Sequence, residues 1–173
     1  MQTFTRKRNR LPATAYRGPH SYFLTLCCHR RQRLFLDTPL VQSLLGLFEN
    51  ACHAHSFQIC AYCFMPDHLH AVLSTDNLSA GLPAVVRAFK GAAVARARQL
   101  GISNLWQKRF YDHVIRSTDS MENVIAYVLN NPVRAGLVNS PGQWSFSGPP
   151  DALSNLTSGA DTCVLPWKET LAG

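Results

Sequence analysis

Two histidines separated by one residue are the feature of this sequence that most directly suggests metal chemistry. His68 and His70 flank Leu69 and follow Pro66-Asp67, a dipeptide typical of a tight turn. On a β-strand, residues two apart point to the same face, so the imidazoles would lie side by side, with Cα atoms about 7 Å apart. Such a pair can bind one metal ion, although histidines on a solvated strand face show the same pattern. The position after a buried apolar strand favours the metal site.

A tyrosine and an asparagine form a second candidate pair. Tyr127 and Asn131 are four residues apart in a segment expected to be helical, so they would share one face of that helix. This face lies at the edge of an apolar stripe, where a side chain can point along the sheet surface without being fully buried. Taken alone, the two residues are better explained as a packing tyrosine and a helix-ending asparagine.

Together, the two pairs suggest phosphoryl-transfer chemistry. Two imidazole nitrogens and one amide oxygen would hold a hard divalent ion such as Mg²⁺ or Mn²⁺, with phosphate oxygens and water completing its coordination. The ion would act as a Lewis acid while the phenol of Tyr127 attacks a phosphodiester and becomes covalently attached to the phosphate. Tyr111 is a rival nucleophile, but aromatics on a predicted strand more often pack in a core or stack on bases.

Alternating strand and helix patterns surround these residues. Strands are predicted at 21–28, 57–65, 68–74 and 105–116, and helices at 39–55, 79–100 and 119–131. Thr38 and Pro39 suit the start of the first helix, Gly101 the end of the second, and Pro132 the end of the third. The predicted fold is α+β, a ferredoxin-like βαββαβ unit with an antiparallel sheet and an extra C-terminal helix that carries Tyr127.

Charge and composition fit a protein that binds a polyanion. Lys and Arg outnumber Asp and Glu by 17 to 10 in 173 residues, a net charge of +7. A membrane helix needs an apolar run of about 18–20 residues, and no run in this sequence is close to that length. The first ten residues also lack the apolar core of a secretory signal. We therefore expect a cytoplasmic protein without a membrane partner. We also expect a basic arm at 1–20, a catalytic domain at 21–147 and a tail at 148–173.

The cysteines predict no disulfide framework. Six are present, mostly inside apolar runs, which is typical of reduced thiols that pack as small apolar residues. Cys60 and Cys63 form a C-x-x-C motif. If they lie on a strand, they should point to opposite faces, which disfavours a shared metal or a redox role.

Several segments resemble one family, the HUH single-tyrosine transposases. Residues 62–70 resemble its histidine motif, residues 106–116 the strand that follows, residues 127–138 the catalytic helix, and residues 144–147 the closing segment. The resemblance runs from about residue 22 to 147 and is nearest to the REP-associated tyrosine transposases. One departure is Asp67, because asparagine is common before the first histidine; we expect this change to have little effect.

The resemblance implies a mechanism and a partner. It implies His68 and His70 as metal ligands, Asn131 as a third ligand and Tyr127 as the nucleophile. Members of the family act on single-stranded DNA, often beside a hairpin, leaving a 5′-phosphotyrosine link and a free 3′-OH that can be rejoined without ATP. A monomer and a homodimer are equally compatible with the sequence.

Basic and aromatic side chains outside the two pairs are candidates for DNA contacts. For any single basic residue, ordinary solvated charge explains the position at least as well. The candidates are Arg8, Arg10, Lys90, Lys108, Arg109, Tyr111, His113, Arg116 and Arg134.

Two other functions are compatible with the sequence. A ferredoxin-like sheet with a basic surface could bind a DNA or RNA hairpin without cleaving it, with aromatics stacking on bases. An unrelated metal-dependent hydrolase would need acidic ligands near the histidines, and only Asp67 and Asp76 are close in the sequence.

Overall fold

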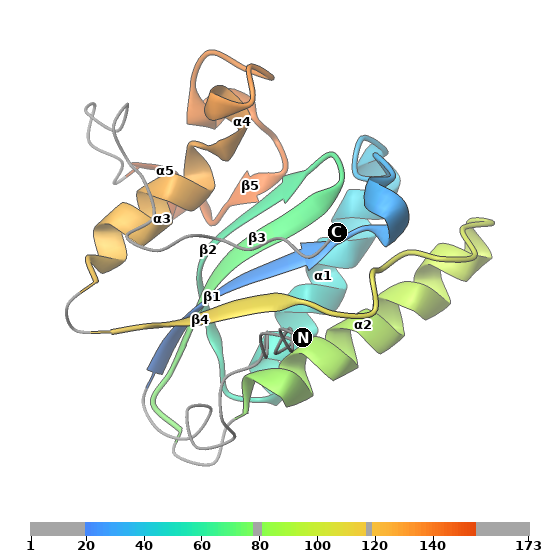
Figure 1. Cartoon of the computed structure of the whole chain (residues 1–173), viewed down its shortest axis with the longest axis horizontal. Coiled ribbons are helices and arrows are strands. Elements are labelled where there is room, and N and C mark those ends of the chain that lie inside the picture. The colour runs from blue at the N-terminus through green and yellow to red at the C-terminus, as the bar shows by residue number, and fades with distance from the viewer. Residues whose placement is uncertain (1–19, 78–80, 117–118, 155–173) are drawn as a thin grey trace, which may run out of the picture.

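The computed structural model describes residues 20–77, 81–116 and 119–154, which form one antiparallel sheet with helices on both faces (Figure 1). The strand order is β4-β1-β3-β2-β5. The strands are β1 (His20–Cys27), β2 (Gln58–Met65), β3 (His68–Thr75), β4 (Tyr111–Ile115) and β5 (Ser147–Gly148). With α1 (Thr38–Ala54) after β1 and α2 (Leu82–Gln99) after β3, the element order confirms the predicted βαββαβ plan.

The alternation of side chains along β1 divides the core into two layers. Leu24 and Leu26 pack with α1 and α2 in the larger apolar cluster, whereas Phe23 packs on the other side of the sheet. That second side is covered by α3 (Met121–Leu129), whose Val124 and Val128 are fully buried. Figure 1 shows α3 on the face of the sheet opposite α1 and α2. The extra C-terminal helix is therefore present where the fold prediction required it.

The helix boundaries differ from the predicted ones by a few residues, for local reasons. Asp37, rather than Thr38, caps α1, because its carboxylate accepts a hydrogen bond of 2.7 Å from the Leu40 amide. Pro39 then occupies the first turn, as predicted. Gly101 follows α2 with a φ of +79°, the left-handed conformation that ends many helices and that glycine adopts without strain.

The third predicted helix, residues 119–131, is two shorter helices. Ser120 caps α3 through a hydrogen bond from the Asn123 amide, so the helix begins two residues after the predicted start. The helix ends at Leu129, and α4 (Asn131–Arg134) follows with Pro132 in its first turn. Pro132 therefore starts a helix rather than ending one, because the amide that proline lacks has no helical acceptor in a first turn.

The fourth predicted strand, residues 105–116, is interrupted. Trp106 forms an isolated bridge with Cys28, and Tyr111 pairs with Thr25. Between these two pairings β1 contributes only Leu26 and Cys27, whereas the other chain segment contributes residues 107–110. The surplus residues cannot enter the ladder, so regular β4 pairing is confined to Tyr111–Ile115.

A β-bulge in β2 corrects the expectation for the C-x-x-C cysteines. The register of β2 against β3 shifts between Ile59 and Ala61, which makes Cys60 the extra residue. The Cys60 Sγ lies 3.2 Å from the hydroxyl of Ser74, on the α3 side of the sheet, where Cys63 is also buried. The two thiols therefore share a face instead of pointing to opposite faces.

The segment that follows α4 forms hydrogen bonds with the C-terminal end of β2. The indole nitrogen of Trp144 donates to the Phe64 carbonyl oxygen at 3.0 Å, and the Phe64 amide donates to the Phe146 carbonyl oxygen at 2.8 Å.

Among the described residues, no helix is both long and apolar enough to span a membrane.

Candidate metal and tyrosine site

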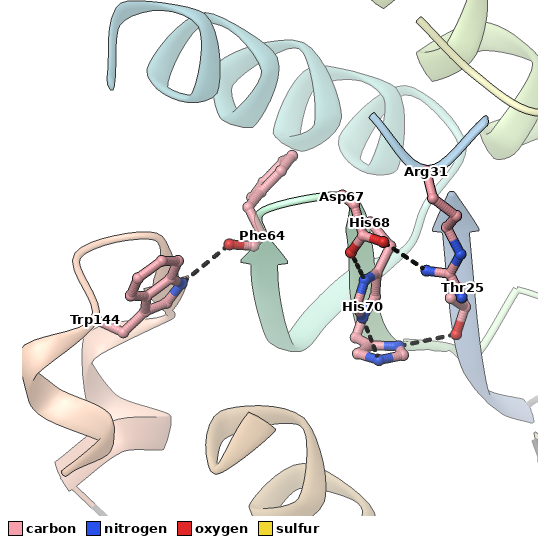
Figure 2. Close-up of polar contacts among 7 residues, drawn as sticks. All are labelled: Thr25, Arg31, Phe64, Asp67, His68, His70 and Trp144. Atoms are coloured by element: carbon pink, nitrogen blue, oxygen red, sulfur yellow. Dashed lines mark hydrogen bonds and ion pairs between the residues drawn. The ribbon is translucent and has the colours of Figure 1, made fainter. Parts of the chain in front are cut away.

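The histidine pair lies at the start of β3, on the face of the sheet that α3 covers. His68 and His70 point toward one another (Figure 2), and their Nε2 atoms are 2.9 Å apart. His70 is 2% exposed, whereas the side chain of His68 is 13% exposed. The period-two prediction that the two imidazoles lie side by side is confirmed by this geometry.

The separation of the two Nε2 atoms fits a shared divalent ion. Adjacent ligands at right angles around an octahedral ion, each at about 2.1 Å, are separated by about 3 Å. Two facing nitrogen lone pairs at this distance repel each other unless a proton or a cation lies between them. Two imidazole nitrogens at this separation can coordinate one divalent metal ion.

Both imidazoles are oriented through their other ring nitrogen. The Nδ1 of His68 lies 2.6 Å from Oδ1 of Asp67, and the Nδ1 of His70 lies 2.8 Å from the buried hydroxyl of Thr25 (Figure 2). A carboxylate only accepts, so the Nδ1 of His68 carries the proton, and a neutral His68 has its lone pair on Nε2. The Thr25 hydroxyl can donate or accept, so it can serve either tautomer of His70. Such partners fix the orientation of metal-binding histidines.

The electrostatics of the pair keep His70 neutral. Burial is the largest cause that lowers the pKa of His70 well below its ordinary value, and the charges of His68, Arg31 and Arg134 lower this pKa further. A neutral imidazole is the form that binds a metal. Burial raises the pKa of Asp67, but the hydrogen bond from His68 and the nearby charges outweigh it, and the net pKa lies below its ordinary value.

Arg31 completes the surroundings of the histidines from the 3₁₀ turn at His29–Arg31. Its guanidinium lies 3.3 Å from the Asp67 carboxylate, and its backbone has a φ of +57°, which is uncommon for a residue with a side chain. Backbone hydrogen bonds join this segment to the Pro66-Asp67 turn. The Cys28 amide donates to the Asp67 carbonyl oxygen, and the Phe35 amide donates to the Pro66 carbonyl oxygen.

Tyr127 projects from α3 toward the same face of the sheet. Its ring centroid is 6.1 Å from that of His70 and 6.1 Å from that of Phe23. The guanidinium of Arg134 lies 4.4 Å from the centre of the Tyr127 ring. The half-buried ring of Tyr127 therefore packs near both the His70 ring and the guanidinium of Arg134, which forms a cation–π contact with it.

Asn131 lies one turn beyond Tyr127, after the break between α3 and α4. Its side-chain nitrogen donates to the Tyr127 carbonyl oxygen at 3.0 Å, which leaves its amide oxygen as the only side-chain atom suited to a metal. Within residues 20–77, 81–116 and 119–154, no group of three His, Cys, Asp or Glu side chains could hold a metal ion. An amide oxygen is outside that set, and the role of Asn131 as third ligand stays a prediction.

The rival tyrosine also faces this layer. Tyr111 is opposite Thr25, which is in turn opposite His70, and its ring lies 6.2 Å from that of Phe23. Tyr111 and Tyr127 thus approach the ring of Phe23 from different elements. The geometry therefore brings both tyrosine rings near the histidine layer.

The remaining candidates for DNA contacts are dispersed. His113 lies 3.4 Å from Asp119, and the Lys90 ammonium donates to the Gln107 carbonyl oxygen at 2.5 Å. Arg116 is exposed after β4. Two further candidates, Lys108 and Arg109, are exposed in the interrupted segment, and two others, Arg8 and Arg10, lie outside the described residues.

Sequence reasoning missed the two side chains that orient His70 and Asp67, namely Thr25 and Arg31. Neither lies near the histidine motif in the sequence, and their positions depend on the β1–β3 register and on a left-handed turn. The only signal in the sequence was that Thr25 is polar within the otherwise apolar run of residues 23–28.

The chain belongs to the IS200-like transposase family, whose model matches residues 18–131. A REP-associated tyrosine transposase of Escherichia coli K12 is 28% identical over 131 residues, covering 73% of this chain and 74% of the relative. A Haemophilus influenzae protein, provisionally named as such a transposase, is 26% identical over 137 residues, or 73% and 77% of the two chains.

The solved structure of a REP-associated tyrosine transposase bound to a REP hairpin is also similar. It superimposes with a TM-score of 0.66 at 26% identity, covering 85% of this chain and 82% of that one. Within the IS200-like family, these similarities place the chain in the REP-associated tyrosine transposase branch.

Proposed function

We propose that this protein cleaves and rejoins single-stranded DNA at hairpins through a covalent bond to Tyr127. The observation that carries the proposal is the convergence, on one face of the sheet, of the facing histidine nitrogens and the tyrosine ring. Membership of a transposase family supports DNA strand cleavage as the reaction class. The hairpin bound by the similar structure supports hairpin DNA as the substrate.

The proposed reaction exchanges one phosphodiester for another. The Oη of Tyr127 forms a bond to phosphorus as the bond from phosphorus to the 3′ oxygen breaks. The phenol proton leaves, and the released oxygen takes up a proton to become a free 3′-OH. The strand on the 3′ side of the break stays attached to Tyr127 through its 5′ phosphate, as a 5′-phosphotyrosine. In the reverse direction a 3′-OH attacks this phosphotyrosine, so rejoining needs no further energy source.

Each residue of the site has a defined task in this scheme. His68 and His70, with the amide oxygen of Asn131, would hold the divalent ion, and a bound Mg²⁺ or Mn²⁺ would neutralise charge developing on the phosphoryl oxygens. Asp67 and Thr25 keep the Nε2 atoms directed toward one point. Within the described part of the chain, no side chain is assigned as the base that accepts the phenol proton.

The cation beside Tyr127 supports the assignment of this residue over Tyr111. Arg134 stacks on the Tyr127 ring at 4.4 Å, where its guanidinium can contact a phosphate that is attached to the phenol. Tyr111 belongs to the sheet itself, where it is the first residue of β4, pairs with Thr25 of β1 and packs on Phe23. We therefore assign packing or base contact to Tyr111.

The test is the formation of a covalent protein–DNA adduct. The protein is incubated with hairpin-bearing single-stranded oligonucleotides and Mn²⁺ or Mg²⁺, and adducts are detected on a denaturing gel. We expect an adduct with the wild type and with Tyr111→Phe, and none with Tyr127→Phe, which should still bind DNA. An adduct that persists in Tyr127→Phe but disappears in Tyr111→Phe would overturn the assignment. Binding without cleavage across many hairpins would instead favour the non-catalytic alternative.

A further inference from the structure

A cavity of about 270 Å³ lies away from the tyrosine, between α2 and the segment that connects it to β4. Figure 1 shows this segment doubling back along α2 before it enters the sheet. The lining contains three cations and no acidic side chain. The lining residues are Lys90, Val94, Arg98, Ser103, Asn104, Leu105, Trp106, Gln107 and Lys108.

One wall of this cavity contains a buried donor without an acceptor. Trp106 is 8% exposed, its ring packs on Phe35 and Phe89, and its Nε1 has no hydrogen-bond partner among the described residues. Buried polar groups are almost always paired, so this unpaired donor is a candidate partner for an acceptor that binds in the cavity. The surrounding cations indicate that this acceptor is anionic.

The cavity and the histidine pair lie near the same end of the sheet but on opposite faces, because Trp106 packs in the α1/α2 layer and His70 packs on Phe23 in the α3 layer. The Gln107 amide donates to the Cys27 carbonyl oxygen at 2.8 Å, and Cys27 is the register partner of His68. Two strand spacings, about 10 Å, therefore separate the backbones of Gln107 and His68. A single strand that reaches both the histidines and the cavity would therefore pass around this end of the sheet.

We propose that this cavity, with Arg98 at its rim and Trp106 in its wall, binds a backbone phosphate of the single strand that flanks the hairpin. The inference rests on the proposed function, because it needs DNA at the histidine face, and it adds a second point of attachment outside the reacting centre. Arg98 neutralises the phosphate, and the indole N–H of Trp106 donates to a phosphate or sugar oxygen. Such a contact is independent of base sequence.

Two variants isolate these contacts from the rest of the fold. Arg98→Gln removes one charge from an exposed position, and Trp106→Phe removes the N–H while keeping an aromatic ring in the core. Arg87→Gln is the matched control, because Arg87 is exposed on the same helix but does not line the cavity. Circular dichroism and thermal unfolding report whether Trp106→Phe folds, and Arg98→Gln keeps the proposal testable if it does not.

The experiment compares two substrates, a hairpin with a single-stranded flank of about eight nucleotides and the same hairpin without it. Binding is measured by fluorescence anisotropy without divalent ions, so that no cleavage occurs. We expect each variant to weaken binding of the flanked hairpin about 5- to 10-fold and to leave the trimmed hairpin unaffected. Arg98→Gln should also lower the slope of log affinity against log salt by about one, whereas Arg87→Gln should not change the flank dependence.

Two outcomes would overturn the inference. One is equal weakening of both substrates by Arg98→Gln, which would indicate general attraction rather than a flank site. The other is no weakening of either substrate by either variant. Adduct formation by the wild type, measured in parallel with Mn²⁺, reports on the proposed function itself, so a failure of the cavity and a failure of the nuclease are distinguishable.

Discussion

Replacement of Asp67 by alanine should weaken metal binding through His68. The carboxylate accepts the Nδ1 proton of His68 at 2.6 Å, and removing it leaves the imidazole free to rotate and less basic. Loss of such a partner typically costs 10- to 100-fold in metal affinity, about 1.4–2.8 kcal/mol. The side chains of Asp67 and His68 are 27% and 13% exposed, so water can replace part of the contact. We therefore expect about a 10- to 30-fold loss for Asp67→Ala.

Two further variants divide this effect into its parts. Asp67→Asn keeps an oxygen that can accept from His68 but removes the negative charge, so we expect a loss of about 3- to 10-fold. Arg31→Ala removes an ion pair of 3.3 Å from a side chain that is 33% exposed. Such pairs contribute about 0.2–1 kcal/mol, so this variant should lose no more than about fivefold. The expected order of damage is Asp67→Ala, then Asp67→Asn, then Arg31→Ala.

The assay is the titration of the purified protein with Mn²⁺, followed by electron paramagnetic resonance of the free ion. The Mn²⁺ dependence of adduct formation provides a second reading. Asp76→Ala is the control, because this exposed carboxylate lies beyond the other end of β3. If Asp67→Ala binds Mn²⁺ within twofold of the wild type, or if Asp76→Ala weakens binding equally, the orienting role of Asp67 is wrong.

Three other predictions follow from contacts in the structure. Arg134→Ala should slow adduct formation about two- to fivefold, the value of an exposed cation–π contact, and an unchanged single-turnover rate would contradict this. Gly148→Ala should lower the free energy of unfolding in urea by about 1–3 kcal/mol, because the new Cβ would lie 2.7 Å from the Tyr62 hydroxyl oxygen. Adding Tyr62→Phe should relieve part of this loss; if the losses of the two single variants simply add in the double variant, the clash is not the cause. Burial raises the pKa of the Cys28 and Cys52 thiols to about 12, so both should stay protonated and resist alkylation at pH 8 in the native protein; peptide mapping that finds them labelled before denaturation would refute this.

The fold was predictable because its signals are local. The helix period of residues 39–55, the apolar run of β2 and the turn at Pro66-Asp67 each depend on neighbouring residues. The errors occur where the outcome depends on another part of the chain. The predicted strand 105–116 is interrupted because β1 offers too few partners, and Cys60 changes face because of a bulge against β3.

The candidate site was predictable to the same extent. His68 and His70 are two residues apart on one strand, so their convergence could be inferred from spacing alone. The nearness of Tyr127 to His70 depends on the docking of α3, and only the resemblance to a family indicated it. Thr25 could not be inferred, because 45 positions separate it from His70 and nothing local determines which strands become neighbours.

The pairing of β1 with β3 makes the site depend on the exact register of these two strands. Thr25 faces His70 only because β1 and β3 pair in one particular register. A shift of one position would bring Leu24 or Leu26 opposite His70 and turn the whole strand over. A single insertion inside β1, between Thr25 and the end of the strand, would therefore remove the hydroxyl from the histidine. The site therefore requires a fixed number of residues in β1, just as it requires histidine at positions 68 and 70.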